Sequence, residues 1–450
     1  MRPVIATGGG GLSWVTTLAM GALIVFMIVP EDFDYESLGS AMPQSGSAAS
    51  RLVWIGLMCA SGLVVLRHLR LARGVVREMN PFLLALAALA GASLLWSIDP
   101  QFTVRRLIRL ATILLVTLAF VLVRGPRIQD VVRPLITAVL IGSIAMVLLL
   151  PDFALERSPS AELVGAWHGL ATQKNGLGSL AAIGTVFWLH AILSRETRGL
   201  TGAAGITVSL VCLFYSRSST SLLTAAFTAP LLIFLLRSPG SLRRYVPWIV
   251  GFCASGLMLY SLAALRIIPG FGLLFRPIGA LTEKDPSFSG RTAIWDIVIE
   301  HIALNPFLGG GFGAYWVGPI TGTASYEHVT RLFFYPTEAH NGYLDVVNDL
   351  GMVGGLCLLG YLICYLRQSC QVFARAPVQG ALYLGVFFEQ LVENMSESRW
   401  FNVLCVEFVI MTLVTAALAR AQFDYRLQER LRNHGHGSGA VRRRPVFAQV

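Results

Sequence analysis

The chain has 450 residues, of which 55% are hydrophobic and 13% charged, and its mean hydropathy is +0.65. Soluble domains carry about 25% charged residues, so this composition excludes a water-soluble globular protein. The net charge of +10 comes mainly from short loops and from the C-terminal tail. Basic residues in such places report membrane topology and contacts with anionic headgroups, so we expect no nucleic-acid partner.

Twelve apolar runs are long enough to cross a membrane as helices. They predict an all-α polytopic membrane protein with about twelve transmembrane helices. In chain order, the predicted spans are Ser13–Pro30, Leu52–Leu66, Pro81–Trp96, Leu107–Val123, Pro134–Leu150, Leu177–Leu193, Leu200–Tyr215, Thr220–Leu236, Tyr245–Leu265, Tyr343–Leu366, Val378–Val392 and Phe401–Ala419.

The distribution of Lys and Arg predicts the orientation of these spans. If the N-terminus is cytoplasmic, 22 of the 35 basic residues fall on the cytoplasmic face, and the first loop of the other face is acidic (EDFDYESLGS). Because cytoplasmic loops retain basic residues, both termini are expected to be cytoplasmic. The chain then divides into nine helices over 1–265, a large periplasmic loop over 266–340, three helices over 341–419 and a basic, disordered cytoplasmic tail over 420–450.

The large loop contains one amphipathic helix, which lies on the membrane or packs under the loop. Ser289 can cap its start, and it should stop at Asn305 because Pro306 follows. Its polar residues, Thr292, Asp296 and Glu300, recur every four positions, and apolar residues lie between them. Beyond the helix, Gly309–Gly311 and Gly313 predict a flexible turn.

Cations gather where the even-numbered helices begin, at the predicted outer face. Helix starts carry partial positive charge, and arginines beside unpaired helix-start N–H groups favour a multiply charged anion. A pyrophosphate carried by a lipid fits this requirement. The residues are Arg105, Arg106, Arg109, Lys174, Arg217 and Arg399, with Arg291 and Arg331 in the loop. The alternative is that the arginines pair with headgroups or with acidic residues, namely Asp345, Asp349, Glu389, Glu393 and Glu397.

His340 is the strongest candidate for proton transfer, because an imidazole titrates near neutrality and this one lies at the membrane boundary beside those cations. Asn341 is its neighbour. Asp345 and Glu393 are the alternative bases, although we expect Glu389 and Glu393 to pair with arginine.

We predict no catalytic metal and no cofactor. The sequence has no HExxH and no Cys-His set, and none of its seven cysteines falls in an outer loop. The outer histidines, His168, His301, His328 and His340, lack the spacing of metal ligands.

Six short segments, in this order, resemble the O-antigen ligase and polymerase superfamily, and most of all its ExoQ-type exopolysaccharide polymerases. They are WSIDPQFTVRRL (96–107), TQKNGLG (172–178), SRSST (216–220), RTAIWD (291–296), NPFLGGGFGAYW (305–316) and AHNGYLDVVNDLG (339–351). Each segment is weak alone, whereas the ordered set is specific.

The resemblance implies a glycosyltransferase of the bacterial inner membrane that uses a polyprenyl-diphosphate-linked glycan at the periplasmic face. It implies that Lys174, Arg217 and Arg291 bind the diphosphate and that His340 assists the attacking hydroxyl. Arg105 and Arg109 are further candidates for the diphosphate, and Arg331 is a secondary one. Where many relatives have His-Lys-Asn, this chain has Gln173-Lys174-Asn175, which puts proton transfer at that position in doubt.

Three functions are consistent with this sequence. The first is a polymerase that joins lipid-linked repeat units into an exopolysaccharide, working beside chain-length regulator or export proteins. The second is a ligase that moves a finished glycan to lipid A core or to a protein. The third is a transporter or flippase, which is disfavoured because the charges collect at one face and no repeat symmetry is visible.

Overall fold

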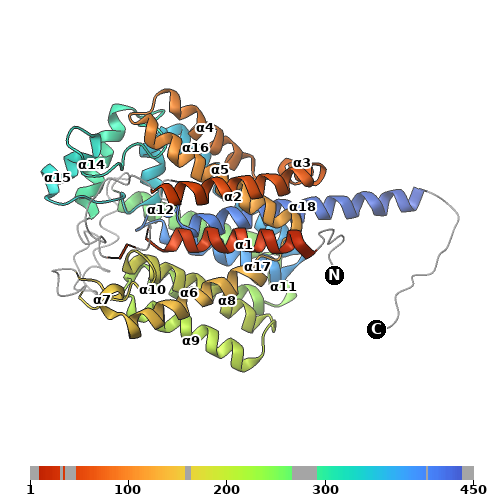
Figure 1. The fold of residues 1–450 in the computed structure, drawn as a ribbon. Coiled ribbons are helices and arrows are strands. Elements are labelled where there is room, and N and C mark those ends of the chain that lie inside the picture. Colours follow the sequence, from red (N-terminus) through yellow and green to blue (C-terminus); the bar gives the residue numbers. More distant parts are fainter. Residues whose placement is uncertain are drawn as a thin grey trace.

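A computed structural model describes residues 10–30, 34–35, 47–157, 164–265, 291–401 and 404–437. Within these ranges the regular secondary structure is helical, and the one β feature is an isolated bridge between Leu155 and Trp167. The helices form one elongated bundle (Figure 1). The predicted all-α fold class is confirmed.

Each of the twelve predicted spans coincides with a helix. These are α1 (Gly10–Ile28), α2 (Ala48–Arg67), α4 (Pro81–Ala92), α5 (Pro100–Arg124), α6 (Gln129–Leu149), α8 (Lys174–Leu193), α9 (Gly199–Tyr215), α10 (Ser219–Arg237), α12 (Val246–Ala264), α16 (Gly342–Arg375), α17 (Pro377–Glu393) and α18 (Val406–Gly437). Short elements connect them: α3 (Leu69–Arg77), η2 (Ser93–Leu95), α7 (Pro151–Ala154), α11 (Gly240–Arg243), α14 (Arg291–Leu304), η3 (Ala324–Tyr326) and α15 (Glu327–Leu332).

The length and composition of these helices make the chain a multi-pass membrane protein. Among the described residues, nine helices are long and apolar enough to cross a membrane, and α3 with α4 adds a tenth if that pair, bent by 102°, is one span. The count of twelve stays a prediction, because α9 and α17 have only 17 residues each.

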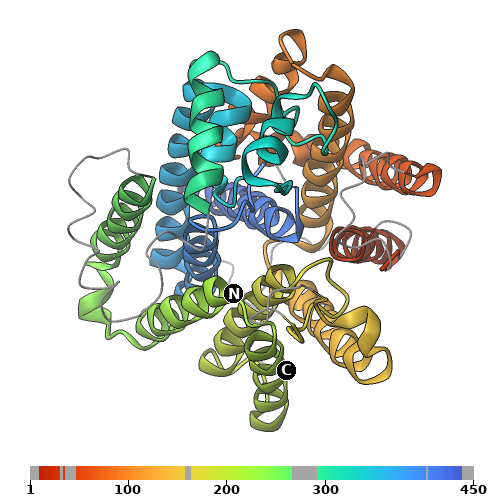
Figure 2. The ribbon, with the colours of Figure 1, turned by 90° about the vertical axis from the view of Figure 1, so that its left-hand side faces the viewer.

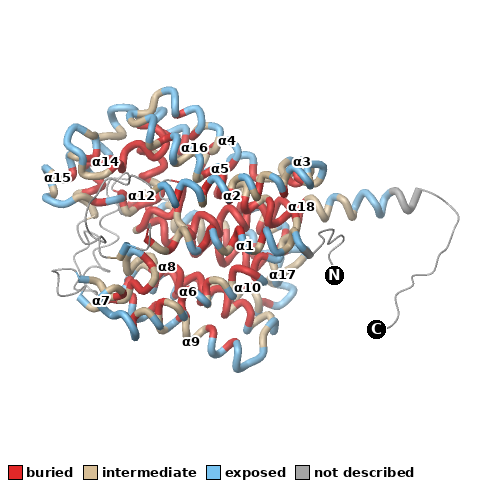
Figure 3. Tube along the Cα trace, viewed as in Figure 1, coloured by how far each residue is buried: buried red, intermediate tan, exposed pale blue. Residues whose placement is uncertain are grey.

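Helix α18 runs through the middle of the bundle, as the end-on view in Figure 2 shows. In the part of α18 that could span the membrane, 94% of residues are buried by the protein itself, compared with 28% in α2. Figure 3 shows the same pattern, with buried residues concentrated along the axis of the bundle and exposed residues around it. The outer helices therefore separate α18 and the segments beside it from lipid.

Two helix starts differ from the predicted ones. Helix α5 begins at Pro100, seven residues before the predicted Leu107, because Asp99 caps it by accepting a hydrogen bond from the N–H of Phe102. Arg105 and Arg109 therefore lie inside the helix and do not open it. Helix α18 begins at Val406 and not at Phe401, so Arg399, which was predicted at its start, lies in the connector from α17.

We expected the C-terminal tail to be disordered from residue 420, and this expectation was wrong for its first part. Helix α18 continues to Gly437, and Arg420 contributes to this by pairing with Asp424 one turn later, at 3.0 Å. Residues 438–450 lie outside the described residues.

The predicted loop helix is present as α14, which ends at Leu304, just before Asn305 and Pro306. Four of its predicted apolar residues are buried, Ile294, Trp295, Ile297 and Val298, whereas Ile299 is exposed. Ser289 lies outside the described residues, so its capping role stays a prediction.

The glycine run after α14 is not the flexible turn that we predicted. The N–H groups of Gly310 and Gly311 donate to the carbonyls of Asn348 and Asp349 in α16, and Gly311 has φ +104°. A Cβ on Gly311 would lie 2.6 Å from the Cα of Ser97. The run therefore consists of glycines because the backbone is packed tightly there, and it fixes the loop to the start of α16.

Helix α16 is interrupted at Gly351, where φ is +65°. The break lets the N–H of Met352 donate to the carbonyl of Pro306, so the loop fills the gap in the helix. Thirty-four helical residues would extend about 50 Å, more than the roughly 30 Å of a hydrocarbon core. The first turns of α16, before the break, therefore belong with the loop.

The loop helices lie at the opposite end of the bundle from the start of α1 and the end of α18. Figure 1 places α14 and α15 at one end, and the start of α1 and the end of α18 at the other.

Reporter fusions should therefore give opposite signals, extracytoplasmic for a fusion at Ser325 and cytoplasmic for one at Arg375. A cytoplasmic signal at Ser325 would contradict the orientation.

Candidate functional site

The candidate site begins at the N-terminus of α16. Asn341 caps this helix by accepting a hydrogen bond from the N–H of Leu344, at 3.0 Å. His340, just before the cap, has φ +51°, a left-handed conformation that is costly for a residue with a side chain. The neighbouring Ala339 is held on both sides, because its N–H donates to Asp345 and its carbonyl accepts from the indole of Trp295. These bonds fix where the His340 side chain points.

The carboxylate of Glu397, in the connector between α17 and α18, contacts side chains from three other parts of the fold and one from the connector itself. Arg291 at the start of α14 donates from Nη2 at 2.6 Å, and Asn175 at the start of α8 donates at 2.8 Å. His340 lies at 3.3 Å through Nδ1, and Arg399, two residues along the connector, lies at 3.5 Å. The carboxylate of Glu397 is fully buried.

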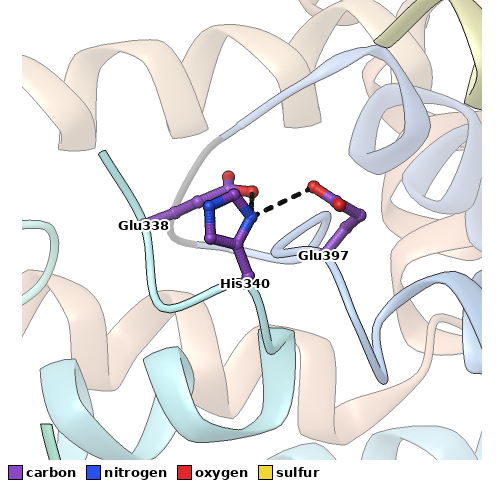
Figure 4. Close-up of side chains that lie close together, drawn as sticks. All are labelled: Glu338, His340 and Glu397. Atoms are coloured by element: carbon purple, nitrogen blue, oxygen red, sulfur yellow. Dashed lines mark hydrogen bonds and ion pairs between the residues drawn. The ribbon is translucent and has the colours of Figure 1, made fainter. Parts of the chain in front are cut away.

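Glu338 faces the same imidazole from its own loop. Its carboxylate lies 3.1 Å from Nδ1 of His340, and its side chain is 3% exposed. Figure 4 shows both carboxylates directed at this one nitrogen. We call Glu397, Glu338, His340, Arg291, Asn175 and Arg399 the Glu397 cluster.

The electrostatics of this cluster decide the protonation of His340. Burial alone would lower the pKa of this imidazole, but the carboxylates of Glu397 and Glu338 outweigh burial and raise the pKa to about 10. Burial opposes the ionisation of Glu397, whereas His340, Arg399 and Arg291 together hold its pKa well below the usual range. At neutral pH the resting site therefore contains a protonated His340, with Nδ1 used by the carboxylates and Nε2 left for another group.

Lys174 and Arg217 meet beside this cluster. The ammonium of Lys174 donates to the backbone carbonyl of Arg217 at 3.2 Å, and Lys174 is followed directly by Asn175 of the cluster. Arg217 has φ +50° and precedes Ser218, the cap of α10, much as His340 precedes the cap of α16. Its side chain is exposed and donates to the carbonyl of Val164 at 3.0 Å.

The side chains of Glu338, His340 and Glu397 are of types that can hold a metal ion, and their ligand atoms lie within 4.8 Å of one another. The oxygens of Glu397, however, already contact two arginines and an amide. A divalent cation would have to displace those groups or share the carboxylate with them. The arrangement fits an ion-paired cluster better than a metal centre, and metal independence stays a prediction.

Three other predicted cations have different contacts. The guanidinium of Arg105 lies over the ring of Phe102, and that of Arg109 lies over Trp54 of α2, at 5.3 and 5.6 Å from the ring centroids. Arg331 of α15 pairs with Glu300 on the surface. None of these particular contacts involves Glu397, and the predicted roles of the three arginines stay predictions.

Asp345, the first of the two alternative bases, is already used as a hydrogen-bond acceptor. Asp345 is buried and accepts from the indole of Trp316 at 2.7 Å, from the N–H of Ala339 at 3.0 Å and from the hydroxyl of Ser398. It thus joins the loop, the segment of His340 and the connector that carries Glu397.

Among the described residues, the hydrogen-bond partners of Glu393 and Glu389 are not the arginines that we expected. Glu393 accepts from the hydroxyls of Ser221 and Thr224 in α10, and Glu389 accepts from Gln390. Small hydroxyls on the facing helix satisfy Glu393 without a long side chain.

Sequence reasoning missed Glu338 altogether and considered Glu397 only as an acidic partner for arginine. The sequence NMSESRW, which contains Glu397 in the connector, includes no recognisable motif. The one available signal was that carboxylates occur near cations at the predicted outer face.

Comparisons with known proteins find similar sequences over part of the chain. Residues 204–359 match the family model described as O-antigen ligase. The chain is 29% identical over 203 residues to the exopolysaccharide production protein ExoQ of Rhizobium meliloti, which covers 43% of this chain and 45% of that protein. It is 28% identical over 155 residues to a putative polysaccharide ligase of Rickettsia felis, covering 31% and 38% respectively.

The chain resembles the O-antigen ligases. The matches extend over less than half of the length of either relative. The part that matches the O-antigen ligase model contains Arg217, Arg291 and His340, whereas Lys174 and Glu397 lie outside it. The structure therefore brings residues beyond the matched part into contact with those inside it.

Replacing Asp345 with Ala should destabilise the site. The change leaves the Trp316 indole, the Ala339 N–H and the Ser398 hydroxyl without their acceptor, at about 1–3 kcal/mol for each buried donor left unpaired. We expect a lower midpoint of thermal unfolding in detergent, with Asp345→Asn between Ala and wild type. Glu300→Ala, an exposed position on α14, is the control. An unchanged midpoint for Asp345→Ala would mean that these bonds do not hold the site.

Proposed function

We propose that this protein is a glycosyltransferase that polymerises polyprenyl-diphosphate-linked oligosaccharides into an exopolysaccharide at the extracytoplasmic face of a bacterial inner membrane. The observation that carries the proposal is the convergence of Lys174, Arg217, Arg291 and His340 from four helix starts beside one buried carboxylate. Both termini would then be cytoplasmic.

The cations suit a reaction in which a lipid diphosphate leaves. A hydroxyl of the acceptor attacks the anomeric carbon of the donor, the bond from that carbon to the diphosphate oxygen breaks, and negative charge grows on the diphosphate. Guanidinium groups and helix-start N–H groups stabilise growing charge more than they stabilise the bound substrate, and this difference is catalysis. Arg291 and the exposed Arg217 would bind the diphosphate, with Lys174 between them. No metal is needed for this charge stabilisation.

His340 would take the proton of the attacking hydroxyl. Its Nδ1 is held by Glu338 and Glu397, an arrangement that orients an imidazole and leaves Nε2 to face substrate. In the resting protein this imidazole is protonated at neutral pH, so the reaction uses the fraction of molecules in which Nε2 has lost its proton.

The acceptor distinguishes a polymerase from a ligase. We favour a polymerase because the relative with the larger matched share is named an exopolysaccharide production protein. A ligase is the second candidate, because the family model and the second relative carry that name. In the polymerase, donor and acceptor are both lipid-linked oligosaccharides, and a chain-length regulator or export protein would be the partner.

The function is tested by polymer formation from lipid-linked repeat units with reconstituted protein. Arg291→Ala and Arg217→Ala should abolish product while the protein still inserts. Arg217→Lys should rescue poorly, because a point charge cannot make a bidentate contact with phosphate. A wild-type yield from either alanine variant would exclude that arginine from the donor site. Strong inhibition by chelator, reversed by a divalent cation, would contradict a metal-free reaction.

The role of His340 can be tested by its pH dependence. If neutral Nε2 takes the proton, turnover should rise with pH towards about 10, the pKa of the imidazole. Glu338→Gln should move this rise to lower pH, since removing one carboxylate lowers that pKa. His340→Ala should lower turnover by about 10²-fold or more, with donor binding largely kept. Turnover that is flat up to pH 10 and falls above it would instead make His340 a hydrogen-bond donor to the diphosphate.

A further inference from the structure

The cations proposed to bind the diphosphate already have an anion among them. The carboxylate of Glu397 is fully buried and lies 2.6 Å from Arg291, 3.3 Å from His340 and 3.5 Å from Arg399. The backbone around it is also fixed, because its carbonyl accepts from the N–H of Gly342 at the start of α16. Glu397 is therefore a built part of the site and not a surface residue that happens to lie near.

The groups around Glu397 are not saturated by it. Arg399 is 4% exposed, and among the described residues its Nε and Nη2 atoms make no hydrogen bond, although Nη2 is within ion-pair distance of Glu397. A buried guanidinium with unused donors is costly to maintain, and it favours a further anion nearby. Nε2 of His340 is likewise outside the contacts with the two carboxylates.

The protein's own carboxylates already balance most of this positive charge. Glu338 and Glu397 face three cations, Arg291, Arg399 and the protonated His340, and Glu407 also attracts Arg399. In the absence of substrate the cations are thus nearly neutralised, and they keep their positions without an external anion. A diphosphate must share them with Glu397 or take them from it.

We propose that Glu397 is a positioning residue that gathers Arg291, His340 and Arg399 before the donor arrives and then competes with the lipid diphosphate for them. The proposal rests on the proposed function. Competition lowers the affinity for the donor, but it lowers the affinity for the lipid diphosphate product as well. The product bears the larger charge, so Glu397 favours its release after each transfer.

The test is Glu397→Gln, which removes the charge and keeps the size and one acceptor oxygen. We expect farnesyl diphosphate, a short polyprenyl diphosphate, to bind the purified variant at least tenfold more tightly than wild type. Turnover with lipid-linked repeat units should fall at least tenfold at saturating donor, because release of the lipid diphosphate product slows. Glu300→Gln is the matched control, since it removes a carboxylate that also pairs with an arginine but lies on the exposed side of α14, and it should change neither quantity.

Unchanged or weaker binding of farnesyl diphosphate to folded Glu397→Gln would overturn the proposal. If that variant does not fold, Asn175→Asp gives the opposite change, because it adds a carboxylate at the position that now donates to Glu397. Binding should then weaken at least fivefold, and wild-type binding would overturn the proposal. Arg291→Ala separates the two hypotheses: if it binds farnesyl diphosphate as wild type does, the proposed donor site itself is wrong.

Discussion

A charge that is removed from water must be paired, and this requirement organises the end of the bundle that carries α14 and the start of α16. Glu397 is fully buried, and its charge is balanced by Arg291, His340 and Arg399. Breaking one member of a buried ion pair costs about 3–5 kcal/mol, because the remaining charge stays buried without a partner. The positions of α8, α14, α16 and the connector from α17 to α18 therefore depend on one another.

Two strained residues accompany this constraint. His340 and Arg217 both adopt left-handed backbone conformations, and each comes directly before a helix cap. Such conformations cost of order 1–3 kcal/mol and persist where the surroundings hold them. At His340 the surroundings are identifiable, since Trp295 and Asp345 hold the neighbouring Ala339 on both sides. Helix α14 contributes both Arg291 and Trp295, so one short helix links the cations to the histidine backbone.

The fold was largely predictable because hydropathy and helix signals act locally. Every predicted span coincides with a helix, and Pro306 ends α14 as expected. The start of α5 at Pro100 was missed because hydropathy marks the apolar centre of a helix, whereas a cap at Asp99 marks its start.

The candidate site was predictable only in part. Grouping cations by membrane face identified Lys174, Arg217, Arg291 and His340, which the structure brings together. It also included Arg105 and Arg109, whose guanidinium groups lie over aromatic rings, and their role in binding the diphosphate stays a prediction. Glu338 is only two residues before His340, but no motif in its segment marks it as a partner of the imidazole. Glu397 could not be recognised, since its pairing with His340 depends on a tertiary contact between residues 57 positions apart. The glycine run was misjudged for the same reason, because its packing partners are in α16 and near Ser97.

The dependence of the site on the Glu397 pairing can be measured most directly with a double-mutant cycle on Glu397 and Arg291. Thermal unfolding of wild type, Glu397→Gln, Arg291→Gln and the double variant would be compared under one detergent condition. If the two side chains stabilise the fold through each other, each single variant lowers the unfolding midpoint and the double variant is no less stable than the worse single one. Losses that simply add would show that the two residues act independently and would contradict the account.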